Sequence, residues 1–443
     1  MRKASLLVCL LLPLTVNAQQ SSIDAMIERD MASMLSTYKM LHGAPELSHR
    51  EEKTSQFFAG ELRKLGYTVT ERIGKFENAD WTSYGVIAVM KNGAGPTVLV
   101  RTELDALPVE EKTGMPYASK ARAKNDAGLE VSVMHACGHD IHMTSLLGTA
   151  KVLSELKSQW QGTLILLGQP SEETGDGARA LLKDNLYTRF PQPDFAIALH
   201  DKAELEAGKV GYTPGYAMAS ATSIDVKIRG IGGHGSAPET TKDPVVVAAQ
   251  VVLALQTIVS RENSPLEPAV VTVGSIHGGT RYNIIPDEVN LQLTVRTYKE
   301  DVRKRILASI ERIVKSAAMS AGIPEDRAPI VKVSEGTTST YNEPKLLERL
   351  TPSLQQALGA DNVVQMPPMM ASEDFGYLSL DHKIPATIIW LGAADPQKVK
   401  QSRDTGIALP GLHSALFAPV PEPTLRTGVK ATTAVVLELM KKQ

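Results

Sequence analysis

Side chains able to bind a divalent metal ion are spread along this 443-residue sequence, and two of them lie close together. Cys137 and His139 are separated by one glycine, which permits a tight backbone and lets two side chains of one loop converge. Thiolate, imidazole and carboxylate groups are ligands that zinc and manganese take in proteins. The candidate ligands are Cys137, His139, Glu173, His200 and His413. Each has an ordinary structural explanation when taken alone, so the set predicts a metal site only if the fold assembles it.

Two adjacent carboxylates, Glu172 and Glu173, follow an apolar segment and precede a glycine-containing turn. Neighbouring carboxylates can divide their roles, because one can bind a metal while the other takes a proton from a metal-bound water. That division suits hydrolysis of an amide, in which water is activated and the leaving nitrogen is later protonated. A solvated acidic turn is the alternative interpretation, and the buried strand expected just before the pair favours a site.

The start of the chain bears on the chemistry of Cys137. Residues 1–18 are typical of a cleaved signal peptide, with a basic start, an apolar run over residues 6–14 and a small-residue cleavage site ending at Ala18. We therefore expect an exported protein, periplasmic or secreted. The chain has two cysteines, and Cys9 would leave with the signal. Cys137 would then have no disulfide partner in an oxidising compartment, which favours a metal ligand or a nucleophile.

Charge and composition exclude some classes of partner. The formal net charge is -2 and no long basic run is present, so we expect no nucleic-acid partner. Charged residues make up 22% and hydrophobic residues 43%, as in ordinary globular proteins. After the signal, no further segment is expected to span a membrane.

The candidate residues follow segments with the pattern of buried strands. We expect these strands over residues 97–101, 163–167, 195–199 and 386–390, and the helices over residues 23–41, 51–65, 142–156, 345–358 and 425–441. Strands that alternate with helices predict an α/β fold, with a mixed, largely parallel sheet and flanking helices. Ligands bind at the carboxyl ends of strands in such sheets, which is where several of the candidates fall.

The pattern changes after residue 212 to a β-α-β-β-α order, which predicts an inserted ferredoxin-like α+β domain. We expect a signal peptide at 1–18, a catalytic domain at 19–214 and 334–443, and a lid or dimerisation domain at 215–333. Within the insert, a glycine-rich turn carries His234, which could donate a hydrogen bond to an oxyanion. The turn lacks the lysine of a phosphate-binding loop. Donors for a substrate carboxylate could come from Arg281, Asn283 and Arg296.

Seven short motifs occur in a recognisable order, within a resemblance that covers about residue 38 to residue 425. They are Thr-Glu-Leu-Asp-Ala-Leu-Pro at 102–108, His-Ala-Cys-Gly-His-Asp at 135–140, Glu172-Glu173, Gly-His-Gly-Ser-Ala-Pro at 233–238, Asn-Ile-Ile-Pro at 283–286, Ser-Glu-Asp-Phe at 372–375 and Leu-His-Ser at 412–414. Together they resemble the aminoacylase and carboxypeptidase superfamily of two-metal hydrolases. Within it they look like the branch of hippurate hydrolases and indole-3-acetyl-amino-acid hydrolases.

The resemblance implies a role for each matching residue. The five candidate ligands would hold two divalent ions per subunit, zinc or manganese, with cobalt and nickel as further candidates. Glu172 would be the general base and later the acid, and Asp105 would orient a metal ligand. His234 and Asn283 would contact the tetrahedral intermediate and the substrate carboxylate from the lid domain. The lid would also form a homodimer.

The implied activity is cleavage of the amide bond of N-acyl amino acids or short peptides by metal-activated water. Two features depart from the family pattern: Glu103 stands where aspartate is usual, and residues 120–132 form a longer stretch that borders the site. Three alternatives remain open. They are a metallo-dipeptidase or carboxypeptidase of the same superfamily, a cysteine hydrolase with Cys137 as nucleophile, and a binding protein without activity.

Overall fold

The computed structural model describes residues 12–442 and divides into two compact units. Unit 1 runs to Gly215 and also contains Asn342–Pro367 and the chain from Tyr377 onward. Unit 2 consists of Tyr216–Tyr341 and Pro368–Gly376. Most of the expected signal peptide, with Cys9, lies outside the described residues, so its cleavage stays a prediction.

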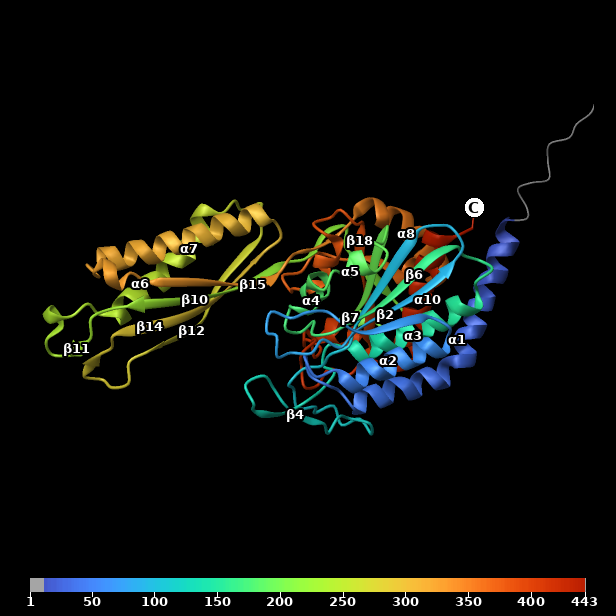
Figure 1. The fold of residues 1–443 in the computed structure, drawn as a ribbon, viewed down its shortest axis with the longest axis horizontal. Helices are drawn as coiled ribbons and strands as arrows, with labels where there is room; N and C mark the ends of the chain where they lie inside the picture. The colour runs from blue at the N-terminus through green and yellow to red at the C-terminus, as the bar shows by residue number, and fades with distance from the viewer. Residues whose placement is uncertain (1–11, 443) are drawn as a thin grey trace, which may run out of the picture. The chain divides into compact units, whose positions relative to one another are not determined.

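An eight-stranded mixed sheet forms the centre of unit 1 (Figure 1). In the order in which they lie, its strands are β1 (Thr68–Ile73), β2 (Gly85–Asn92), β6 (Gly162–Gln169), β3 (Thr97–Glu103), β7 (Phe195–Glu206), β18 (Ala386–Ala394), β8 (Val210–Tyr212) and β17 (Val363–Gln365). The four strands from β6 to β18 run parallel, and β2 and β8 flank them antiparallel. Both β3 and β18 are buried along almost their whole length, as expected for parallel strands covered on both faces. The predicted α/β class is confirmed.

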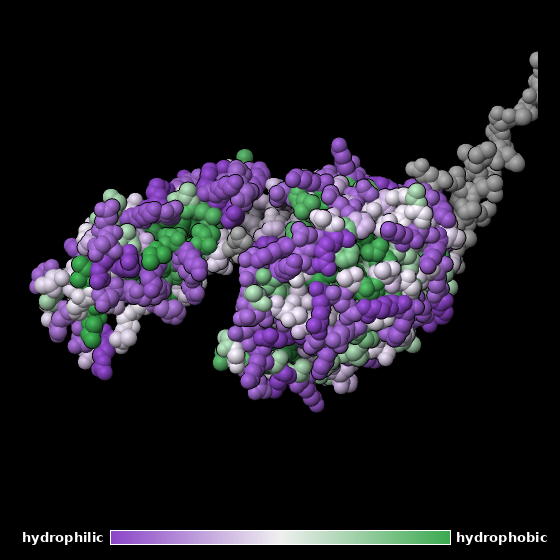
Figure 2. Space-filling model, viewed as in Figure 1, coloured by the Kyte–Doolittle hydropathy of each residue, from purple (hydrophilic) through white to green (hydrophobic). Residues whose placement is uncertain are grey.

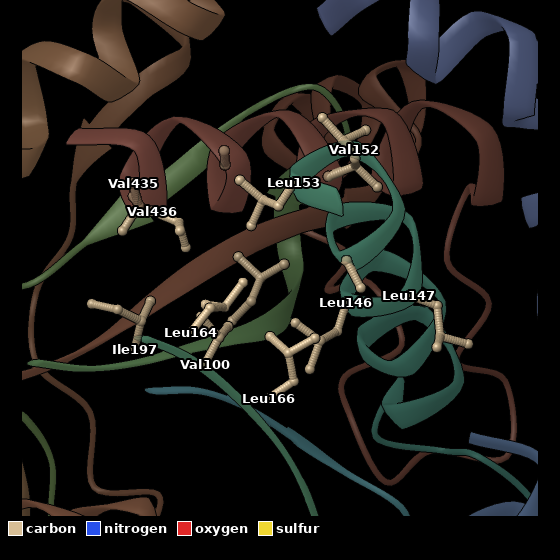
Figure 3. Packing of buried hydrophobic residues seen from close by; sticks show 14 of the residues in the cluster. Val100, Leu146, Leu147, Val152, Leu153, Leu164, Leu166, Ile197, Val435 and Val436 are labelled. Atoms are coloured by element: carbon tan, nitrogen blue, oxygen red, sulfur yellow. The ribbon is translucent and has the colours of Figure 1, made fainter. Parts of the chain in front are cut away.

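Helices surround this sheet. They are α1 (Leu12–Gly43), α2 (Glu52–Lys64), α3 (His139–Glu155), α4 (Gly177–Lys183), α5 (Leu186–Arg189), α8 (Pro344–Leu358), α9 (Pro396–Thr405) and α10 (Pro421–Met440). Figure 3 shows how α3 and α10 lie against the strands: Leu146 and Leu153 of α3 and Val436 of α10 gather beside Leu164 and Leu166 of β6. Replacing one of these buried leucines by alanine would cost about 2–5 kcal/mol of stability.

Several elements of unit 1 extend beyond the bounds expected from sequence, and two of these differences bear on the candidate ligands. Strand β7 continues past residue 199 to Glu206, because residues 200–202 pair with β18, so His200 lies inside the strand and not at its end. Helix α3 begins at His139 and not near residue 142. The backbone turns at Gly138, whose φ of 83° lets the helix start directly after the cysteine loop.

Residues 120–132 form a hairpin that stands apart from the main sheet, shown in teal in Figure 1. Its two short strands are β4 (Arg122–Lys124) and β5 (Glu130–Ser132). At the tip, Asn125 closes the turn, because its side-chain oxygen accepts from the backbone N–H groups of Ala127 and Leu129 at 3.1 and 3.0 Å.

Unit 2 is built on an antiparallel four-stranded sheet in the order β12-β14-β10-β15. Its elements are β10 (Ser220–Arg229), α6 (Pro244–Thr257), β12 (Ala269–Gly278), β14 (Glu288–Thr297), α7 (Glu300–Ser320) and β15 (Ile330–Thr337). Strand β10 alternates between buried and more exposed side chains, since one face packs under α6 and α7. Small pairs are β11 (Gly233–His234) with β13 (Ile284–Ile285) and β9 (Gly215–Met218) with β16 (Thr340–Asn342). The predicted inserted α+β fold is confirmed.

Helix α6 is apolar on both sides. Val247, Val251 and Leu255 are buried in the core of unit 2, whereas Val246 and Leu253 are exposed. On the face that Figure 2 shows, apolar side chains of this unit reach the surface among polar ones. By length and composition, Pro244–Glu262 also qualifies as a candidate membrane span, which corrects the expectation that no such segment follows the signal. The packing of its buried side on the sheet is that of a core helix.

Candidate metal centre

The cysteine loop and the start of α3 place two candidate ligands side by side. Gly138 separates them, and a Cβ atom at this position would clash with Oδ2 of Asp201. Its positive φ and this close approach both require glycine. Cys137 and His139 are buried, so their side chains face the interior of unit 1.

The five candidate ligands of unit 1 come together with the spacing of a metal site. Sγ of Cys137 lies 3.6 Å from Nε2 of His200. The two oxygens of Glu173 face different histidines, with Oε1 3.8 Å from Nε2 of His139 and Oε2 3.4 Å from Nε2 of His413. Ligands held about 2.0–2.3 Å from a tetrahedral ion stand about 3.3–3.8 Å apart, which these distances match.

Two groups of three ligand atoms can be drawn within the cluster. Cys137, His139 and His200 form one group, and Cys137, Glu173 and His413 form the other, with all ligand atoms of a group within 4.8 Å of one another. The shared thiol is common to both groups. The arrangement therefore has the donors for two neighbouring ions.

Asp105 holds two members of the cluster in place. Its Oδ2 accepts from the backbone N–H of Glu173 at 3.0 Å, and Nδ1 of His139 lies 2.8 Å from its backbone oxygen and 3.4 Å from its Oδ1. Because Nδ1 faces Asp105 in this way, Nε2 of His139 is the nitrogen that could bind a metal ion, and it has no hydrogen-bond partner among the described residues although it is buried. A buried ring nitrogen aimed at carboxylates fits a bound cation.

His200 and His413 are oriented by backbone contacts. Nδ1 of His200 bonds the carbonyl of Asp201 at 2.9 Å, so Nε2 faces the cysteine. His413 has a left-handed backbone with φ of 65°, and its N–H donates to the carbonyl of Ala136 at 2.8 Å, which ties its loop to the cysteine loop. The side chain of His413 is 55% exposed, so the cluster is open to solvent on this side.

The cluster has an excess of negative charge. Burial would lower the pKa of His139, but the hydrogen bond to Asp105 and the charges of Glu103, Asp105 and Glu173 outweigh it and raise that pKa to about 10. Such a pKa means that the surrounding carboxylates strongly favour a positive charge at this point. A divalent metal ion bound at this point would balance the same negative charge.

A second layer lies behind the ligands. Glu103 is fully buried beside Arg101, and one of its oxygens lies 2.9 Å from Nδ1 of His142. Nε2 of His142 then accepts from the backbone N–H of Asp201 at 2.7 Å. Glu103, which departs from the family pattern, thus braces β7 next to His200. Sequence reasoning missed His142, although its position one helical turn after His139 was a usable signal.

The predicted substrate contacts belong to unit 2. His234 on β11 lies next to Asn283, because the N–H of Gly235 donates to the Asn283 carbonyl at 2.9 Å. Nδ1 of His234 lies 2.7 Å from Oγ of Ser236. Arg296 on β14 is half-buried and donates to Oγ of Ser372 at 2.8 Å. The structure places these residues in one unit and leaves their contact with substrate a prediction.

Comparison with known proteins decides the family. The model of peptidase family M20/M25/M40 matches residues 99–407, which include four of the five clustered ligands. This chain belongs to that family. The N-acetyl-L-cysteine deacetylase of Bacillus subtilis (strain 168) is 36% identical over 357 residues, covering 80% of this chain and 78% of that protein. The hippurate hydrolase of Campylobacter jejuni is 36% identical over 341 residues, covering 76% of this chain and 82% of that protein.

A solved structure extends the likeness to most of the chain. A Bacillus subtilis protein described as a dinuclear metal-binding peptidase from family M20 superposes with a TM-score of 0.73. It is 25% identical and covers 93% of this chain and 99% of that chain. This chain is therefore a metal-dependent amidohydrolase or peptidase. Metal-dependent chemistry replaces the alternatives of a cysteine hydrolase and of a binding protein without activity.

Proposed function

We propose that this chain is an exported hydrolase that removes the acyl group from N-acyl amino acids, in the hippurate and indole-3-acetyl-amino-acid hydrolase branch of its family. The two relatives above are named for removing an acyl group from an amino acid nitrogen, which supports this substrate class. The observation that carries the chemistry is the carboxylate of Glu172, whose Oε2 lies 3.9 Å from Nε2 of His139 at the edge of the ligand cluster.

Two divalent ions would be held by the two groups of ligands that share Cys137. The donor set of one thiolate, three imidazoles and a carboxylate suits zinc or manganese, and cobalt or nickel are further candidates. Bound there, divalent ions would supply Lewis acidity, which lowers the pKa of water and polarises a carbonyl group.

Glu172 would accept the proton of the attacking water and pass it to the leaving amine nitrogen. Its neighbour Glu173 is held by the Asp105 hydrogen bond, so the two adjacent carboxylates have different surroundings. Asp105 keeps His139 oriented throughout. His234, Asn283 and Arg296 would bind the substrate oxyanion and carboxylate from unit 2.

Two substitutions separate catalysis from metal binding. Glu172→Gln should retain the metal content of the parent chain and lose at least about a hundredfold in kcat, because the amide cannot accept a proton. Cys137→Ala should lower the metal content, since both groups lose a donor. Metal analysis and hydrolysis rates measure both effects. Near-normal turnover in the first variant would exclude Glu172 as the base, and a metal-replete second variant would exclude Cys137 as a ligand.

A substrate screen tests the proposed class against a dipeptidase or carboxypeptidase. The purified protein, after metal analysis, is offered N-acetyl and N-benzoyl amino acids beside dipeptides with a free amino terminus. We expect kcat/KM to be higher for the N-acyl compounds. Preference for free dipeptides would support the alternative and contradict the proposal.

We further propose that unit 2 forms a homodimer. The exposed side of α6 is apolar, with Leu253 72% and Val246 53% exposed, and a second copy of the chain would cover it. Leu253→Glu should then shift the mass measured by light scattering from dimer to monomer, with Gln256→Glu on the same helix as the control. A parent chain that is monomeric at micromolar concentration would contradict this.

Export is proposed from the pattern of residues 1–18. Expression with this segment should yield a periplasmic or secreted protein whose first residue is Gln19. Fractionation and N-terminal sequencing measure this, and a chain that keeps Met1 in the cytoplasm would contradict it.

A further inference from the structure

The loop between α1 and α2 contacts the segment that carries the two adjacent glutamates. Ser171, the residue before Glu172, donates from both its backbone N and its Oγ to Oε1 of Glu51, at 2.7 and 2.9 Å. The N–H of His49 in turn donates to Oγ of Ser171 at 2.9 Å. Oγ of Ser48 donates to Oδ2 of Asp105 at 2.7 Å. This short loop therefore contacts both the residue before the two adjacent glutamates and the residue that orients His139.

The backbone at this contact adopts a conformation that needs support. His49 and Ser171 both have positive φ values, 62° and 51°, which are unfavourable for residues other than glycine. Residues with such a strained backbone occur where the surrounding contacts hold them in that conformation. Here the two strained residues hydrogen-bond to each other, and the buried Glu51 binds one of them twice.

The ring of His49 extends this contact in two directions. Its Nδ1 lies 2.9 Å from Oδ2 of Asp126 at the tip of the β4–β5 hairpin, and its Nε2 lies 3.4 Å from Oδ2 of Asp176, just after the acid pair. The ring stacks on Trp81 with centroids 3.8 Å apart and meets the edge of Phe76. The side chain is 1% exposed, so the ring is fixed between the two segments.

Charge strengthens both contacts. Burial would lower the pKa of His49, but Asp176 and Asp126 outweigh it and raise that pKa above its ordinary value. The raised pKa favours the protonated ring, in which both nitrogens can donate to these carboxylates. The guanidinium of Arg50 also faces Asp126 at 3.5 Å, which adds a second cation to the hairpin tip.

We propose that His49 latches the tip of the β4–β5 hairpin to the Ser171–Gly177 loop and so positions Glu172. This inference rests on the proposed function, since Glu172 is there the proton acceptor. His49 touches neither substrate nor the reacting atoms, and is a positioning residue. The hairpin, which is the longer stretch noted in the sequence, then serves as an anchor for the catalytic loop.

The test uses the full chain with two latch variants and one control. His49→Phe keeps an aromatic ring in the stack and removes both hydrogen bonds. Asp126→Asn changes only the group on the hairpin that His49 contacts, and Asp126 is partly exposed. Glu130→Gln, which removes an exposed carboxylate on the same hairpin, is the matched control. The measurements are amide hydrogen exchange of residues 171–177, metal content, kcat and KM.

We expect both latch variants to speed exchange in residues 171–177 and to lower kcat about tenfold with little change in KM or metal content, because a misplaced catalytic group slows chemistry. The variant that carries both substitutions should be no worse than His49→Phe alone, since Asp126→Asn alters a contact that His49→Phe has already removed. The control should behave as the parent chain.

Unchanged exchange in Asp126→Asn, or faster exchange with unchanged kcat, would overturn the proposal, as would loss of metal as the sole cause of lower activity. If His49→Phe does not fold, Asp126→Asn alone decides between these outcomes. If the parent chain hydrolyses nothing, the proposed function fails, while the exchange data still confirm or overturn the latch.

Discussion

At the scale of single residues, Glu51 supports the candidate site by accepting hydrogen bonds from Ser171, the residue before Glu172. Its carboxyl is buried, and Oε2 has no hydrogen-bond partner among the described residues. Burial, followed by the charge of Asp105, raises its pKa to about 8. An acid that keeps its proton near neutrality can support Ser171 without adding another negative charge next to Asp105.

This pKa predicts a pH dependence of stability. Between about pH 5 and pH 8 the unfolded chain has lost the Glu51 proton while the folded chain keeps it, so the free energy of unfolding falls as pH rises. Glu51→Gln resembles the protonated acid and removes this dependence. Its melting temperature relative to the parent should therefore increase from pH 5 to pH 8. Thermal unfolding at several pH values measures this, with Glu52→Gln as control, and a constant difference would contradict it.

At the scale of elements, the turn from the cysteine loop into α3 decides whether two ligands can share one loop. Gly138 provides it, because its φ is positive and Asp201 leaves no space for a Cβ atom. The same turn makes His139 the first residue of the helix, so its ring points back towards the loop that carries Cys137.

A pair of glycine substitutions tests this turn. Gly138→Ala combines a left-handed backbone with a clash against Asp201, and we expect it to lose metal and at least about 2 kcal/mol of stability. Gly128→Ala in the hairpin has φ of 76° and nothing within 4 Å of the new Cβ, so it reports backbone strain alone. Metal analysis and denaturant unfolding measure both. Equal effects at the two positions would show that the close contact at Gly138 is unimportant.

At the scale of the whole molecule, the candidate metal ligands and the proposed substrate contacts belong to different units. All five clustered ligands, with Glu172 and Asp105, belong to unit 1, whereas His234, Asn283 and Arg296 belong to unit 2. A fold of this kind can keep its metals while the substrate contacts are changed.

This division predicts the behaviour of His234→Ala. The variant should bind the parent amount of metal and lose at least about tenfold in kcat, because a donor to the developing oxyanion is removed. Metal analysis beside steady-state kinetics measures the two effects separately. Ser236→Ala, which removes the hydroxyl beside the His234 ring, is the control for local folding. Loss of metal in His234→Ala would contradict the assignment.

Sequence by itself determined the chemistry and the order of elements. The ligand types, the Cys-Gly-His spacing and the Glu172-Glu173 pair are local features, and apolar runs indicated the buried strands that carry them. The sequence places the ends of elements less precisely than their centres. Strand β7, for example, continues past residue 199 because it pairs with β18. The carboxyl ends of parallel strands meet at one edge of a sheet. The sequence therefore predicts that the candidate ligands following these strands cluster at that edge.

Only the tertiary structure decided what holds the cluster in place. Ser48, His49 and Glu51 are common residue types in a loop, and nothing in their spacing indicates that they bind Asp105, Asp176 and Ser171. These partners lie far away in sequence, so the contacts follow from how α1 packs on α3 and α10 and how α2 packs on β1 and β2. Hydrogen bonds of this kind depend on positions within a few tenths of an ångström, which only the folded chain supplies.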